Sequence, residues 1–132
     1  MRPLLLCVLL TLGGCVTTTI APPMSQILKG EVHLNEALPH PATVEVTVLS
    51  QMEGRPLQVA SIRYEVTMLP LVFDMRLTPL QWGKGELYVR TRLRFVGNSA
   101  IQATGLQKVH KVLNGRPMVI LLQPRSCYPK CQ

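Results

Sequence analysis

The residues best arranged for a chemical reaction lie near the N-terminus, where residues 12–15 have the sequence Leu-Gly-Gly-Cys. A large aliphatic residue, two small residues and a cysteine form a lipobox, at which a bacterial envelope protein is acylated on the cysteine and cut just before it. Residues 1–14 also carry a positive charge at Arg2 and an apolar run that matches a signal-peptide core and is too short to span a bilayer. The sequence predicts a lipoprotein signal peptide over residues 1–14 and covalent lipid on Cys15. The alternative is an ordinary secretory signal with a chance cysteine.

Cleavage before Cys15 would leave residues 15–132 as the mature chain. Residues 16–25 contain three consecutive threonines and the pair Pro22 and Pro23, with no apolar period. Because proline blocks a helix, residues 15–25 are expected to form a flexible, lipidated tether. Ten residues reach at most about 35 Å when extended, so the folded part would stay near the membrane.

Two cysteines close to the C-terminus could also do chemistry. Cys127 and Cys131 are separated by Tyr-Pro-Lys. A redox motif normally has two intervening residues, and a zinc site needs four ligands, for which the chain offers no second pair. In an oxidising periplasm we expect these cysteines to form a structural disulfide that pins the C-terminal tail.

Three arginines at alternate positions, Arg90, Arg92 and Arg94, share one side of an expected strand. They form a cationic row about 13 Å long, which could dock an acidic peptide or anionic lipid. The alternative is cross-strand pairing with glutamates, or plain solvation. Trp82, the only tryptophan, lies in the turn before this strand. It is either a lid over the core or a binding anchor.

No arrangement of residues supports catalysis. His33, His40 and His110 lie on different expected elements, and the only aspartate, Asp74, lies beside Arg76 on an outward face. The sequence contains no nucleophile elbow, no metalloprotease helix motif and no phosphate-binding loop. We expect no enzyme activity, no catalytic or metal-binding residue, no cofactor beyond the lipid, and no small-molecule substrate.

The elements that must position these residues are strands. From residue 26 onward apolar and polar residues alternate with a period of two, and proline or glycine interrupts each run. The expected strands cover residues 27–34, 43–49, 57–66, 71–77, 87–95, 101–109 and 117–123, with the last two joined across Asn114 and Gly115. One turn of helix is possible at residues 78–83. The pattern predicts an all-β fold over residues 26–132, a single antiparallel β-sandwich of about seven strands.

Composition limits the partners. The chain has a net charge of +7, which becomes +6 once Arg2 is removed with the signal peptide. This balance suggests an acidic partner surface, or solubility near anionic lipid headgroups. Nucleic acid is not expected as a partner, because the envelope holds none and aromatic residues make up only 5% of the chain.

Three segments together with the lipobox and the tether suggest a family. Residues 69–73 (LPLVF), 85–90 (GELYVR) and 127–131 (CYPKC) resemble the YscW-type pilotin lipoproteins of type III secretion systems. The resemblance covers nearly all of the mature chain, and its most specific part is the tail motif. It implies a compact β-sandwich that holds the C-terminal segment of the secretin, the ring-forming outer-membrane channel, and promotes secretin targeting and assembly. Only Cys15, Cys127 and Cys131 carry over by position.

The resemblance also implies a location. In similar lipoproteins an aspartate after the acylated cysteine favours retention in the inner membrane, and this chain has Val16 there. The expected location is therefore the periplasmic face of the outer membrane, through a lipid anchor. The alternative function is that of a general envelope β-sandwich lipoprotein with another periplasmic partner, as an inhibitor or a structural protein, because a fold alone does not define a function.

Overall fold

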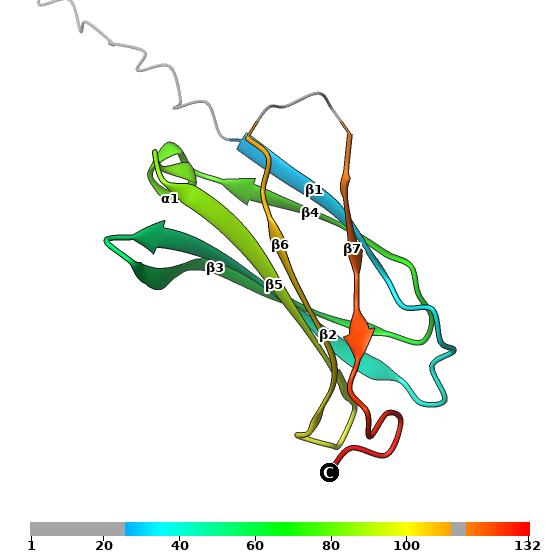
Figure 1. Ribbon diagram of the computed structural model, residues 1–132. Helices are drawn as coiled ribbons and strands as arrows, with labels where there is room; N and C mark the ends of the chain where they lie inside the picture. The colour runs from blue at the N-terminus through cyan, green and yellow to red at the C-terminus, as the bar shows by residue number, and fades with distance from the viewer. Residues whose placement is uncertain (1–25, 112–115) are drawn as a thin grey trace, which may run out of the picture.

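Two β-sheets packed face to face form the computed structural model, which describes residues 26–111 and 116–132 (Figure 1). The strands are β1 (Gln26–His33), β2 (Ala42–Met52), β3 (Arg55–Val66), β4 (Leu71–Leu77), β5 (Glu86–Phe95), β6 (Ile101–Lys108), β7 (Met118–Leu121) and β8 (Gln123–Pro124). The predicted all-β sandwich is confirmed. The predicted signal peptide, the tether and the connection across Asn114 and Gly115 lie outside the described residues.

The two sheets are unequal in size. One has three strands in the order β4-β1-β7, and the other has five in the order β3-β2-β5-β6-β8. Every neighbouring pair is antiparallel except β1 and β7, which run parallel. The expectation of a purely antiparallel sandwich therefore needs this one correction.

The prediction of a single last strand over residues 117–123 is wrong. The segment forms two short strands, and the first of them, β7, makes the parallel pair with β1. The chain leaves the three-stranded sheet after Leu121 and joins the five-stranded sheet at Gln123. Leu122 lies between them and its backbone N–H donates to the carbonyl of His33 at 2.8 Å. Ile120 and Leu122 are both buried, so the alternation continues unbroken across the change of sheet. A period-two pattern reports which residues face inward but not which sheet carries them.

The core fills the space between the sheets. The apolar residues of the alternating pattern that are buried include Val32, Val44, Val46, Val48, Phe73, Met75, Leu77, Leu87, Val89, Leu93 and Phe95. On β3 the residues of the alternating pattern that face the core are only half-buried: Ala60, Ile62, Tyr64 and Val66. Because β3 is an edge strand of the larger sheet, fewer neighbours cover its inner face.

The predicted helical turn is also present. The helix α1 (Pro79–Trp82) begins at Thr78, whose hydroxyl accepts from the N–H of Gln81, while the Gln81 side chain accepts from the N–H of Thr78. This reciprocal capping box satisfies two N–H groups that the first turn would otherwise leave free. The Gln81 amide also donates to the carbonyl of Val59 at 2.9 Å, which ties α1 to β3. No helix within the described residues is long and apolar enough to cross a membrane.

Candidate functional site

The arginine row lies on the outer face of the five-stranded sheet. On β5 the side chains of Val89, Thr91 and Leu93 are buried, which turns the intervening arginines outward. On β6 the residues directly opposite Arg90, Arg92 and Arg94 are Leu106, Thr104 and Ile101. The arginines therefore have uncharged cross-strand neighbours on that side.

The three arginines of the row differ in whether they form an ion pair. Arg94 has its Nη1 4.0 Å from Glu45 Oε2, and its Nε donates to the carbonyl of Ser99 at 3.2 Å. Glu45 also accepts from Arg63 Nε at 3.2 Å. The pairing alternative thus applies to Arg94.

Arg90 and Arg92 make no hydrogen bond or ion pair within residues 26–111 and 116–132. Arg92 is directly opposite Glu45 in the β2–β5 register, yet Glu45 is engaged by Arg63 and Arg94. The Nε of Arg90 is buried without an acceptor. Such an orphaned N–H costs about 1–3 kcal/mol, so an incoming acceptor would be favoured there.

The carboxylate at the start of β5 does not neutralise this pair. Glu86 accepts from Lys108 Nζ at 2.9 Å and from the Tyr88 hydroxyl at 2.9 Å. These hydrogen bonds, that of Lys108 first, lower the pKa of the Glu86 carboxyl. Glu86 is therefore already engaged at the end of the row.

A shallow groove of about 540 Å³ runs beside the two unpaired arginines. We call it the arginine groove; its lining includes Arg90, Arg92, Ile101, Thr104, Leu106 and Leu121. Leu106 is 67% exposed and Leu121 is 43% exposed, although both are large and apolar. No carboxylate lines this groove. The groove combines exposed aliphatic surface with uncompensated positive charge.

Sequence reasoning found the arginines of this groove but not its leucines. Leu106 and Leu121 occupy outward positions of their strands, which is a signal that the period-two pattern does carry. Their proximity to Arg90 depends on strand register and on the change of sheet at Leu122, neither of which the pattern specifies.

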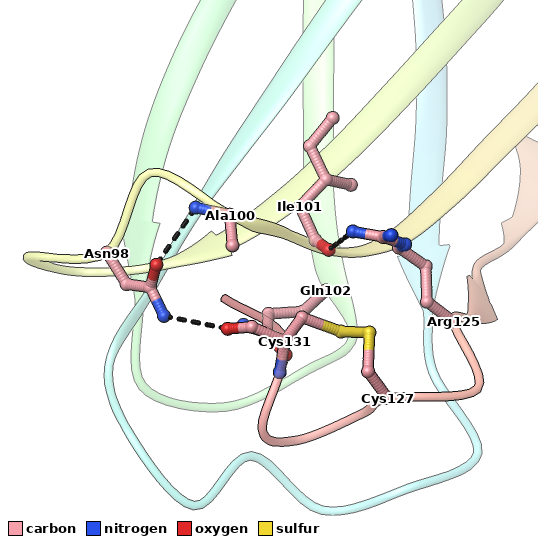
Figure 2. Close-up of a disulfide and its surroundings, with 7 residues drawn as sticks. All are labelled: Asn98, Ala100, Ile101, Gln102, Arg125, Cys127 and Cys131. Atoms are coloured by element: carbon pink, nitrogen blue, oxygen red, sulfur yellow. Dashed lines mark hydrogen bonds between the residues drawn. A yellow bond between two sulfur atoms is a disulfide. The ribbon is translucent and has the colours of Figure 1, made fainter.

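The C-terminal tail lies at the end of the sandwich opposite α1 (Figure 1), and Figure 2 shows its disulfide and the residues around it. Cys127 and Cys131 are joined by a disulfide, with their Cα atoms 4.9 Å apart. The carbonyl of the buried Cys131 accepts from the side-chain amides of Asn98 and Gln102, each at 3.1 Å. Arg125 donates from Nη1 to the carbonyl of Ile101 at 3.0 Å. These bonds hold the tail against the β5–β6 connection.

A further contact ties the tail to the connection between β1 and β2. The hydroxyl of Tyr128 donates to the carbonyl of Ala37 at 2.8 Å, and partial burial raises its pKa. An open depression of about 670 Å³ lies here, with Phe95, Asn98 and Cys131 in its lining. Asn98 and Cys131 are bonded to each other, so the tail is held to the β5–β6 connection here.

The position of Trp82 agrees with its interpretation as a lid over the core. Its side chain is partly buried and packs against the core. The Nζ of Lys111 donates to the Trp82 carbonyl at 2.9 Å and lies 5.5 Å from the centroid of the ring. Trp82 is not part of the lining of the arginine groove.

The remaining candidates are not brought together. The part of the chain that the structure describes contains no group of three or more histidine, cysteine, aspartate or glutamate side chains able to hold a metal ion. His33 lies beside Glu31 at 3.1 Å, whereas His40 packs edge-on against Phe95. The predicted lipidation site, Cys15, lies outside the described residues.

Comparison with known proteins agrees with the fold and with the resemblance noted in the sequence. The type 3 secretion system pilotin of Yersinia enterocolitica is 37% identical over 122 residues, which cover 92% of this chain and 87% of that protein. The pilotin of the same name from Pseudomonas aeruginosa is 33% identical over 131 residues, covering 97% of this chain and 91% of that protein.

A solved structure shares the architecture. It is an alternative pilotin from the type II secretion system of Vibrio cholerae, with a TM-score of 0.60, 18% identity, and coverage of 77% of this chain and all of that one. The likeness concerns the fold alone. The family model described as type III secretion system lipoprotein chaperone (YscW) matches residues 23–121. The chain therefore belongs to the YscW family of type III secretion system lipoprotein chaperones.

Proposed function

We propose that this protein is a pilotin that binds the C-terminal segment of a type III secretion secretin and promotes its targeting to, and assembly in, the outer membrane. The observation that carries the proposal is the identity of 37% and 33%, over almost the whole chain, to two proteins named type 3 secretion system pilotins. A pilotin needs a surface for a peptide and a means of staying at the membrane.

The peptide surface is available on the outer face of the larger sheet. The arginine groove presents exposed leucines beside unpaired arginines, and a peptide can use both apolar and charged contacts. The protein acts by holding another chain and requires no reaction of its own.

The membrane connection is a covalent lipid on Cys15, at the periplasmic face of the outer membrane. Each buried methylene contributes about 0.8 kcal/mol, so one acyl chain binds marginally and two or more hold firmly. The sandwich begins at Gln26, so a tether of about ten residues would keep the secretin segment close to the membrane surface.

Two measurements test the proposal. A synthetic peptide of the secretin C-terminus should bind the mature chain carrying Cys15→Ser without any lipid, as measured by calorimetry. Deletion of the gene should leave the secretin misplaced or unassembled into heat-stable multimers, and secretion should fall. Absence of peptide binding at high micromolar concentration, together with normal multimers in the deletion strain, would favour a general envelope lipoprotein instead.

A further inference from the structure

We infer that the arginine groove is the docking surface for the partner peptide, and that its occupant is an apolar segment carrying carboxylates. This inference rests on the proposed function, which supplies a peptide to be held. It assigns the contact to Arg90, Arg92, Leu106 and Leu121, and it excludes Arg94 and Trp82 from that contact.

The charge of the groove calls for an acidic occupant. Arg90 and Arg92 are two residues apart on one strand face, which separates them by about 6.6 Å. The two nearest glutamates in the register, Glu45 and Glu86, already accept from other side chains. A carboxylate from outside would form charge-assisted hydrogen bonds with guanidinium groups that otherwise have no protein acceptor.

The spacing sets the pattern of carboxylates. An extended peptide places residues i and i+2 on one side at about the same 6.6 Å, and a helix places residues i and i+4 about 6 Å apart. Either conformation can therefore present two carboxylates to Arg90 and Arg92. The groove therefore requires two suitably spaced carboxylates in its occupant and does not require one particular backbone conformation.

The apolar half of the groove calls for aliphatic side chains next to those carboxylates. Leu106 stands directly opposite Arg90, and Leu121 lines the same groove from β7. Both remain exposed in the isolated chain. Contact with an aliphatic side chain would remove their surface from water and would also exclude water from the charged contacts beside them.

Two other occupants fit less well. A second copy of the mature chain would bring a net charge of +6, the +7 of the full sequence less Arg2, toward a cationic groove, which opposes association. A membrane would be expected nearer the end where β1 begins, because Gln26 pairs with Leu77 immediately before α1. Arg90 and Arg92 instead lie midway along β5, on the flank of the sandwich.

The test compares the two arginines that form no ion pair within the described chain with Arg94, which pairs with Glu45. Binding of the secretin C-terminal peptide to the mature Cys15→Ser chain is measured for the double variant Arg90→Gln/Arg92→Gln and for the control Arg94→Gln. At low salt we expect Kd to rise about tenfold or more in the double variant and to stay within about twofold in the control. The difference should shrink at 1 M salt, where charges are screened over about 3 Å.

A second pair of variants tests the apolar contact. Leu106→Ser should raise Kd severalfold with little dependence on salt, because it removes apolar rather than ionic contact. Val72→Ser is the matched control, since Val72 is 68% exposed on β4 of the other sheet and should leave Kd unchanged. These residues are exposed, so thermal melting should confirm that each variant keeps the wild-type fold.

The outcomes separate the two proposals. If the wild type binds the peptide and neither the double arginine variant nor Leu106→Ser weakens binding, the groove assignment is wrong and the pilotin function stands. If the wild type does not bind the peptide, the groove loses its occupant and the inference fails; normal secretin multimers in the deletion strain would then refute the proposed function as well. Loss of binding to anionic vesicles in the double arginine variant, without any effect on the peptide, would identify a lipid-facing surface and overturn the inference.

Discussion

At the scale of single residues, the tail depends on one buried side chain. Gln102 is the extra residue where the β5–β6 register shifts between Leu93 and Arg94, and it is completely buried. Its amide donates to the carbonyl of Cys131 at 3.1 Å and accepts from the N–H of the same residue at 3.3 Å. The bulge therefore directs the polar side chain of Gln102 into the interior, where it hydrogen-bonds the backbone of Cys131.

Replacing Gln102 by leucine, which has a similar volume, should destabilise the protein by about 1–3 kcal/mol, because the buried N–H of Cys131 loses its acceptor while the carbonyl keeps only the bond from Asn98. Urea unfolding measures the change. The control Asn98→Ala also removes two hydrogen bonds, one to the carbonyl of Cys131 and one from the N–H of Ala100, but Asn98 is less buried than Gln102, so the cost should be smaller. Equal costs for both variants would contradict a special part for Gln102.

The disulfide should contribute less than its place in the tail suggests. It closes a loop with a sequence separation of 4, for which chain entropy gives only about 2 kcal/mol. The double variant Cys127→Ser/Cys131→Ser should lower the melting temperature by several degrees and leave far-ultraviolet circular dichroism unchanged. A tail peptide with two free thiols, found by mass measurement of the exported protein without reduction, would refute the bond itself.

At the scale of elements, the three-stranded sheet depends on a glycine at its centre. Gly30 on β1 pairs with Phe73 on β4 and with Met118 on β7. A Cβ at residue 30 would collide with Cζ of the Phe73 ring and would lie 2.6 Å from its Cε1 and 3.1 Å from Cγ of Met118. The absence of a side chain lets the buried Phe73 ring lie across β1.

Gly30→Ala should therefore destabilise the protein by about 1–3 kcal/mol through overpacking, as measured by chemical unfolding. In a Phe73→Leu background, where the colliding ring atoms are gone, the same substitution should cost clearly less. Additive costs in the double variant would show that the ring is not the cause.

At the scale of the whole molecule, the arginine groove lies along β5 and β6 of the larger sheet with Leu121 of β7 at its side, and the sandwich begins at Gln26 on the smaller sheet. A lipid anchor at Cys15 would determine where the protein is held but not how it folds, because none of the described contacts involves the anchor. Anchoring and folding should therefore be separable.

Cys15→Ser should abolish acylation and release a soluble or uncleaved protein, which fractionation of the envelope and mass measurement will detect. Cys7→Ser is the control, since Cys7 lies inside the predicted signal peptide and should leave processing unchanged. A Cys15→Ser protein that is still processed and still found in the outer-membrane fraction would disprove the lipid anchor.

The sequence by itself determined the fold class and most of the inner faces. Val44, Val46 and Val48 alternate with polar residues, and a strand with one buried face is the local consequence of that alternation. The helical turn at residues 78–83 was also predicted from the sequence, and the capping box of Thr78 and Gln81 that the structure shows there is a local feature as well. Such features depend on neighbours in sequence, so they can be predicted without knowledge of the rest of the chain.

Only the tertiary structure decided the strand order, the change of sheet at Leu122 and the character of the arginine row. Arg90, Arg92 and Arg94 are equivalent in the period-two pattern, yet Arg94 reaches Glu45 and the other two have no partner among the described residues. That difference arises because register brings residues more than 40 positions apart into contact. Long-range packing selects the register, and a one-residue slip would exchange the inner and outer faces of a strand.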